Sequence, residues 1–294
     1  MVMKKKIAVT TDSNSGILPD EGRANNVFVL PMPFLIDGEC YFENVNLTQE
    51  SFYQKLAANA EVSTSQPSVG ELTEFWSGLL KDFDEIVHIP MSSGLSQACA
   101  SATALSHSPE YEGKVYVVDN HRISVTMKES VYDAAKLRDQ GKTAAEIKAY
   151  LEETSGCSSI YIAVDTMKYL KKGGRVTPAA AMIGTILKIK PILQIHGEKL
   201  DKYALARGNQ KAKELMKAAM KKDLETFLAP YVENGELALY VAHTDNETEA
   251  KAFSEELKVL FPNIPVTYCD RLSLSVSCHI GPGSLAIACA RFVK

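Results

Sequence analysis

The sequence predicts an α/β protein, because short apolar runs typical of strands alternate with longer segments of helical periodicity. Such alternation is typical of parallel or mostly parallel sheets whose two faces are covered by helices. The length of 294 residues and the 46% share of hydrophobic residues allow two compact domains with well-buried cores. No run of roughly 18 consecutive apolar residues occurs, so we expect no membrane span.

The first half of the chain alternates regularly between strand and helix. Residues 6–10 are a predicted strand, and residues 27–35 an extended run that Pro31 and Pro33 make irregular or confine to a sheet edge. The remaining predictions are a hairpin-like turn over 37–39 into Tyr41 and Phe42, helices over 48–58 and 68–81, a strand over 85–90, a helix over 94–106, a strand over 114–119, and a helical region over 124–154 interrupted at 141–142.

Residues 156–158 are the predicted boundary between an N-terminal domain (1–156) with a mostly parallel sheet and a C-terminal domain (157–294) with a mixed sheet and helices. The second series starts with a strand at 161–164. It continues with a strand pair over 190–195 and 199–206 around residues 196–198, a helix over 209–227, a strand over 237–242, a helix over 246–260 and a strand over 265–269. Periodicity leaves residues 284–293 open between a strand and a short helix.

Composition excludes several classes of protein. The net charge of −4 argues against a nucleic-acid binder, whose surface is normally basic. The apolar run after the basic N-terminal segment, residues 1–6, is too short for a signal peptide. The six cysteines form no C-x-x-C pair and no zinc-like spacing, as expected for a cytoplasmic protein without a metal site.

Two segments rich in hydroxyl groups, residues 62–68 and 90–96, point to an anion site. The second segment lies between an apolar strand-like run and a helix-like one. Free N–H groups and the helix dipole favour an anion at such a junction. The segment 10–13 also follows a strand, and ligands of open α/β sheets bind at the carboxyl ends of strands. Because no Lys or Arg is near, the pattern favours holding a carboxylate over cleaving a bond.

His279 and the glycines after it form a third candidate. Residues 281–286 match the G-x-G-x-x-A pattern, but without the βαβ unit of a dinucleotide site we interpret them as a tight turn near a ligand. His279 could donate a proton to a ligand oxygen, although most single histidines are ordinary core or surface residues. A serine hydrolase using Ser96 and His279 is an alternative, yet no G-x-S-x-G turn occurs. No P-loop for ATP occurs either.

Residues 166–197 carry positive charges and no Asp or Glu, and Arg207 follows shortly. This stretch is either a solvated positive face or a docking surface for an acidic or phosphate-bearing partner. Its basic residues are Lys168, Lys171, Lys172, Arg175, Lys188 and Lys190.

Taken in order, six motifs make the whole chain resemble the DegV family. The characterised members of that family are fatty-acid-binding proteins, including the lipid-carrying B subunit of bacterial fatty acid kinase. The motifs are Thr11-Asp12-Ser13, Thr64-Ser65-Gln66-Pro67-Ser68, Ser92-Ser93-Gly94-Leu95-Ser96, Lys172-Gly173-Gly174-Arg175-Val176, Leu187-Lys188-Ile189-Lys190-Pro191 and His279-Ile280-Gly281-Pro282-Gly283.

The resemblance implies two α/β domains, an apolar tunnel for an acyl chain, and a protein that is not itself an enzyme and has no resident cofactor. The ligand would be a long-chain fatty acid such as palmitate, and the partner the catalytic subunit of a fatty acid kinase. Transient contact with a membrane surface is compatible with this role. The implied carboxylate ligands are Thr64, Ser96 and His279, with Ser65, Ser93 and Gly281 as secondary candidates, and the implied docking residues are Arg175, Arg207 and Lys172.

Two departures from the family pattern concern the pocket mouth. Gln97 and Ala98 replace the usual Gly-Thr pair, and Asn120 follows Asp119 where serine is common. A bulkier residue beside the head-group puts the preferred acyl chain in doubt more than lipid binding itself. Three functions therefore stay open: a carrier that presents fatty acid to a kinase, an acyl hydrolase or transferase, and a lipid-responsive regulatory module.

Overall fold

The computed structural model describes residues 5–184, 189–196 and 199–294. The elements before residue 156 are β1 (Ile7–Asp12), a 3-10 turn η1 (Ser13–Ser15), α1 (Pro19–Ala24), β2 (Val27–Leu30), β3 (Pro33–Ile36), β4 (Glu39–Phe42), α2 (Gln49–Ala57), β5 (Val62–Thr64), α3 (Val69–Leu79), β6 (Glu85–Ile89), α4 (Ala98–Ser106), β7 (Val115–Val117), α5 (Ser124–Asp139) and α6 (Ala144–Glu153).

The elements after residue 156 continue the alternation of strands and helices. They are β8 (Ser158–Ala163), α7 (Lys168–Gly173), α8 (Pro178–Ala181), β9 (Ile189–Ile195), β10 (Asp201–Arg207), α9 (Gly208–Glu225), α10 (Ala229–Glu233), β11 (Leu237–His243), α11 (Glu247–Leu260), β12 (Val266–Arg271), α12 (Leu274–Ile280) and β13 (Leu285–Arg291).

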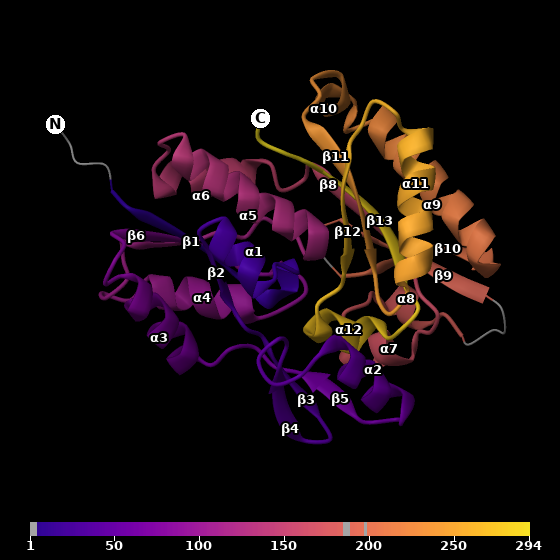
Figure 1. Ribbon diagram of the computed structural model, residues 1–294, viewed down its shortest axis with the longest axis horizontal. Coiled ribbons are helices and arrows are strands. Elements are labelled where there is room, and N and C mark those ends of the chain that lie inside the picture. The colour runs from indigo at the N-terminus through magenta and orange to yellow at the C-terminus, as the bar shows by residue number, and fades with distance from the viewer. Residues whose placement is uncertain (1–4, 185–188, 197–198) are drawn as a thin grey trace.

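Within the described residues, the strands form three sheets (Figure 1). The first sheet has the order β2-β1-β6-β7 and is entirely parallel. The second has the order β10-β9-β8-β13-β11-β12 and is mixed, since only β11 and β12 run parallel. The predicted α/β class, with a parallel N-terminal sheet and a mixed C-terminal one, is therefore confirmed.

The third sheet, with the order β4-β3-β5, is a small antiparallel unit. Together with α2 it packs against α12, which comes from the other end of the chain; Figure 1 shows these elements at the bottom of the molecule. The shared core contains Phe34, Phe52 and Leu56 from the third sheet and α2, and Leu274 and Cys278 from α12. The domain boundary predicted between residues 156 and 157 stays a prediction. The packing of the third sheet on α12 joins the two halves of the chain.

Local capping explains why several predicted helices begin where they do. The Thr48 side chain accepts a hydrogen bond from the Ser51 N–H at the start of α2. Ser68 and Glu71 form a reciprocal capping box at the start of α3. Val69, in the first turn of α3, is 56% exposed, because it lies away from the core that holds Trp76.

The structure changes or decides three other predictions and adds a helix, α12, that was not predicted. The extended run over 27–35 divides between β2, an edge strand of the first sheet, and β3, the centre of the third. The helix expected from residue 94 begins at Ala98, since residues 93–95 form a turn. The open segment 284–293 contains the central strand β13, and the added helix α12 comes shortly before it. Leu187, Lys188, Gly197 and Glu198, which the sequence analysis also used, lie outside the described residues.

In the described part of the chain, we find no helix with the length and apolar character needed to cross a membrane.

We expect Phe52→Ala to lower the free energy of unfolding by about 3–5 kcal/mol, because the buried ring packs edge-to-face on Phe34 and Tyr53 and would leave a cavity. Urea denaturation followed by circular dichroism measures this loss. Val45→Ala is the matched surface control, since Val45 is 68% exposed, and its effect should stay within about 0.5 kcal/mol. A loss below about 1 kcal/mol for Phe52→Ala would show that the third sheet does not depend on this core.

Candidate ligand-binding site

The carboxyl end of β1 carries a buried carboxylate, Asp12, that joins two turns. Its Oδ1 accepts hydrogen bonds from N–H and Nδ2 of Asn14, each at 2.8 Å, and its Oδ2 accepts from the Met91 N–H at 2.9 Å. Burial raises the pKa of Asp12 to about 6, and the three hydrogen bonds act in the opposite direction. Asp12 thereby ties the turn after β6 to the turn after β1.

The turn that follows Met91 presents the hydroxyl of Ser96. The backbone N–H groups of Leu95 and Ser96 donate to the Ser92 carbonyl at 3.0 and 3.1 Å, which folds the turn back on itself. The Ser96 Oγ accepts a hydrogen bond from the Ala98 N–H at 3.1 Å, at the start of α4. Because this oxygen already accepts within the protein, its proton is available for donation to a ligand.

Thr64 and His279 meet across 215 positions of sequence. Thr64 ends β5, and His279 lies near the end of α12, so the packing of the third sheet on α12 brings them together. The Thr64 Oγ1 lies 2.8 Å from Nε2 of His279, a hydrogen-bond distance.

Burial, assisted by the positive charge of Arg175, lowers the pKa of His279 to about 4. The imidazole is therefore neutral near pH 7. When its proton is on Nε2, it donates to Thr64, whose hydroxyl proton can then point elsewhere. Thr64 and Ser96 can both act as neutral donors in this state.

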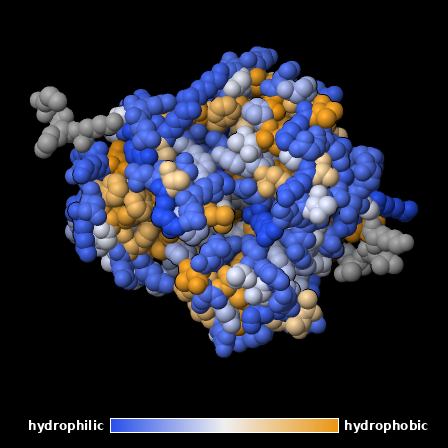
Figure 2. Space-filling model, viewed as in Figure 1, coloured by the Kyte–Doolittle hydropathy of each residue, from blue (hydrophilic) through white to orange (hydrophobic). Residues whose placement is uncertain are grey.

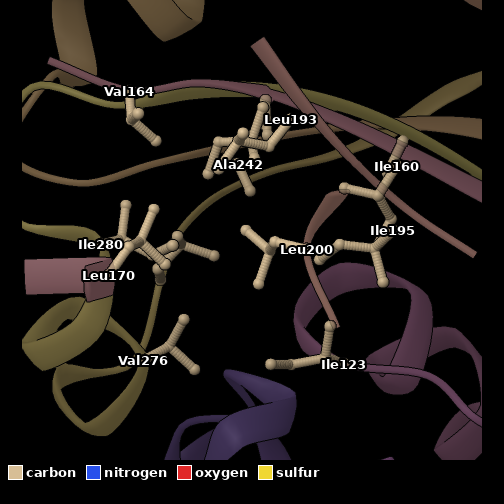
Figure 3. Close-up of a cluster of buried hydrophobic side chains, with 14 of the residues drawn as sticks. Ile123, Ile160, Val164, Leu170, Leu193, Ile195, Leu200, Ala242, Val276 and Ile280 are labelled. Carbon is tan, nitrogen blue, oxygen red and sulfur yellow. The ribbon is translucent and has the colours of Figure 1, made fainter. Parts of the chain in front are cut away.

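These groups border a cavity of about 370 Å³, a size within the range of small-molecule sites. Most of the cavity wall is apolar. Strands of the second sheet form one side of it, and α7 and α12 contribute to the other. Figure 3 shows Leu170, Val276 and Ile280 opposite Ile160, Ile195 and Leu200. Other apolar lining residues are Met32, Met91, Leu95, Ile123, Val125, Ile162, Ala242, Leu272, Ala286 and Ala288. The outer surface differs: Figure 2 shows mostly hydrophilic side chains on the viewed face.

The three secondary candidates have different surroundings. Ser65 lines the cavity, and its hydroxyl donates to the Gln66 carbonyl at 3.2 Å. Ser93 and Gly281 are not part of the described lining. The Ser93 N–H donates to an Asp119 carboxylate oxygen at 3.3 Å, and Gly281 packs against the ring of Tyr169.

The three basic residues expected at a docking surface are also separated. Arg207 is exposed at the junction of β10 and α9. Lys172 is exposed and forms an ion pair with Glu61 at 2.6 Å. Arg175 is half-buried in the cavity wall, where it donates to the carbonyls of Leu95 (3.3 Å) and Gly173.

Polar lining residues that the sequence analysis missed include Asn14, Ser124 and Ser275. The Ser275 hydroxyl donates to Asn14 Oδ1 at 2.5 Å, so the turn after β1 also contacts α12. Asn14 could have been found, because it directly follows the predicted site segment 10–13. Ser275 could not, because the helix that carries it was not predicted.

The geometry bears on the alternative chemistry of Ser96 and His279. The His279 Nε2 is bonded to Thr64, and no hydrogen bond between Ser96 and His279 occurs. Burial raises the pKa of the neighbouring Cys278 thiol to about 12, so this thiol stays protonated. Among the residues that the structure describes, no cluster of three or more His, Cys, Asp or Glu side chains could hold a metal ion.

Comparison with known proteins agrees with the fold and the motifs. Protein DegV of Bacillus subtilis is 29% identical over 283 residues, covering 96% of this chain and 98% of that protein. Among solved structures, a fatty-acid-binding DegV family protein from Thermus thermophilus superposes with a TM-score of 0.86 at 26% identity, covering 98% of this chain and 100% of that chain. DegV of Bacillus subtilis, described as a fatty acid binding protein, gives 0.83 at 28% identity, covering 98% and 99%. A family model described as "Uncharacterised protein, DegV family" matches residues 6–291, and the chain therefore belongs to the DegV family.

Proposed function

We propose that the protein binds a long-chain fatty acid such as palmitate in the apolar cavity and presents it to a separate ATP-dependent kinase. Thr64, Ser96 and His279 hold the carboxylate in this proposal. One observation carries it: an apolar cavity of about 370 Å³ is bordered by the hydroxyls of Thr64 and Ser96 and the neutral imidazole of His279, with Arg175 also in its wall. The fatty-acid binding described for the relatives from Thermus thermophilus and Bacillus subtilis supports it.

Burial of the acyl chain would supply most of the affinity. A sixteen-carbon acid has about fifteen apolar carbons, and each buried methylene contributes roughly 0.8 kcal/mol, or on the order of 10 kcal/mol before the costs of ordering. The head-group contacts would then fix the register of the chain in the cavity.

Neutral donors have a chemical consequence for the carboxylate. Because Thr64, Ser96 and His279 hold it without a tight ion pair, it stays nucleophilic. In the kinase reaction one carboxylate oxygen would attack the γ-phosphorus of ATP, and ADP would leave, which gives an acyl phosphate for lipid synthesis. The catalytic groups would come from the kinase, so this chain would be a lipid-binding subunit of the cytoplasm.

The basic residues suggest how the two proteins would meet. Arg207 is exposed at the surface, whereas Lys172 and Arg175 have partners within the chain. We propose that Arg207 contacts the kinase, with Lys172 and Arg175 at the edge of the contact. The proposed N-terminal domain, residues 1–156, would contribute the hydroxyls. The proposed C-terminal domain, residues 157–294, would contribute the basic surface and His279.

The first prediction from the proposed function concerns the bound ligand. We expect native mass spectrometry of the purified protein to show added mass of one fatty acid, which denaturation releases and an organic extract identifies. A protein that is empty, and stays empty after incubation with palmitate and with oleate, would contradict fatty-acid binding. Hydrolysis of acyl esters by the purified chain would support the alternative of Ser96 and His279 acting in catalysis.

The second prediction separates the head-group from the tail. Thr64→Ala combined with Ser96→Ala should lower the rate of phosphorylation by a bacterial fatty acid kinase about tenfold or more. Affinity for oleate should fall much less, since the apolar wall is unchanged. Phosphate transfer from labelled ATP and calorimetric titration measure the two effects. Equal losses in both would refute the assignment of the hydroxyls to the head-group.

The third prediction concerns pH. The pKa of His279 is about 4 in the folded protein and near 6.5 in the unfolded chain. Between these pH values the unfolded chain binds more protons at His279 than the folded protein does. The stability that the neutral His279 contributes is therefore lost as the pH falls from 6.5 to 4. We expect His279→Gln to remove this loss, on the order of 3 kcal/mol, from the pH dependence of the unfolding free energy. Urea denaturation at several pH values measures it, and a difference from wild type that is constant with pH would contradict it.

A further inference from the structure

Helices α7 and α12 contact each other through two glycines and two rings. The His279 imidazole, on α12, lies against Gly173 at the end of α7. The Tyr169 ring, one turn earlier on α7, lies against Gly281, which directly follows α12. Each helix therefore places a ring on a glycine of the other.

The backbone does not explain why residue 173 is glycine. Its neighbour Gly174 has a φ of +66° and caps α7 in the left-handed conformation, which favours glycine. Gly173 has no positive φ and is helical, so alanine would suit its backbone better. Lack of space for a side chain explains the glycine instead, because a Cβ at residue 173 would lie 2.8 Å from Cε1 of His279 and closer still to Nδ1.

Gly281, at the end of α12, is likewise covered by a ring, that of Tyr169 on α7. Its φ is +77°, and a Cβ there would lie 2.6 Å from Cε2 of Tyr169. The Tyr169 ring therefore packs directly on the backbone at the end of α12. The imidazole that contacts Thr64 occupies the space that the missing side chain of Gly173 leaves free.

We propose that Gly173 and Tyr169 are positioning residues, which set the place of the His279 imidazole and through it the head-group site. In one respect this rests on the proposed function, namely that His279 contacts a fatty acid carboxylate. A methyl group at residue 173 would overlap the imidazole, and we expect the ring to leave its place beside Thr64 and become more accessible to solvent. Tyr169 acts from the other side by keeping α12 in place.

Few charged groups act on this imidazole. Arg175, from the loop after α7, is the charged neighbour that lowers its pKa. β5 contributes the Thr64 hydroxyl. The turn after β6 contributes only serine, glycine and leucine over residues 92–96, and no titratable side chain. A change in the titration of His279 in a residue 173 variant therefore reports on burial and on the distance to Arg175.

The test measures the imidazole in the ligand-free protein by NMR, with the His279 signal assigned from its absence in His279→Gln. We expect the pKa of His279 to rise from about 4 in wild type by at least one unit in Gly173→Ala. Gly78→Ala is the matched control, because Gly78 also lies in a helix and a Cβ there meets nothing within 4 Å. An unchanged pKa in Gly173→Ala would overturn the proposal.

Tyr169 provides a second pair of variants that does not depend on the folding of Gly173→Ala. Tyr169→Ala removes the ring and should also raise the pKa of His279, whereas Tyr169→Phe keeps the ring and should restore the wild-type titration. Equal titration in both would show that the ring over Gly281 does not position α12.

Oleate binding then tests the link to the head-group. Gly173→Ala should weaken oleate binding about tenfold in wild type and have almost no effect in a His279→Gln background, because its influence passes through the imidazole. Additive losses would overturn the proposal. If wild type binds no oleate or palmitate, the proposed function fails, while the titration still decides whether Gly173 and Tyr169 position His279.

Discussion

The burial of α12, in which every residue except the partly exposed His279 is buried, is the constraint on which the site depends. This seven-residue helix presents Leu274 and Cys278 to the core of the third sheet, and Val276 and Ile280 to the core that lines the cavity. A helix this short has little stability of its own and is held by tertiary packing and by its caps. Ser273 accepts from the Val276 N–H, and the Glu43 carboxylate accepts from the Leu274 N–H at 2.7 Å.

The same burial sets the charge of the side chains around the proposed head-group site. His279 loses its proton more readily and Cys278 holds its own more firmly, because each charged form would lie in a poorly solvated place. Asp12 is the buried acid nearby, and three N–H donors satisfy it. The proposed carboxylate-binding groups at the cavity are therefore neutral hydroxyls and a neutral imidazole, and Arg175 is the charged side chain in the described part of the wall.

Local sequence predicted the elements whose own residues determine them. Thr48 and Ser68 cap α2 and α3 because their side chains reach N–H groups three residues away, and the gap at 141–142 separates α5 from α6 for similarly local reasons. The prediction failed where a segment lacks an amphipathic period. Residues 274–280 are apolar or small on nearly every face, so no helical stripe marks them. The Ser96 turn was placed correctly after β6, but the helix was expected to begin too early.

By itself the sequence determined the α/β class, the order of most strands and helices, and the short hydroxyl, glycine and histidine motifs, because these depend on neighbours along the chain. Tertiary structure decided which motifs meet. Thr64 reaches His279 because the third sheet packs on α12, and the turn that carries Ser96 is tied to the end of β1 by Asp12. Tertiary structure also places Arg175 in the cavity wall and not on the outer surface where it was expected. Its guanidinium donates there to the carbonyls of Leu95 and Gly173. Contacts between distant residues depend on how whole elements pack, and no local pattern records that packing.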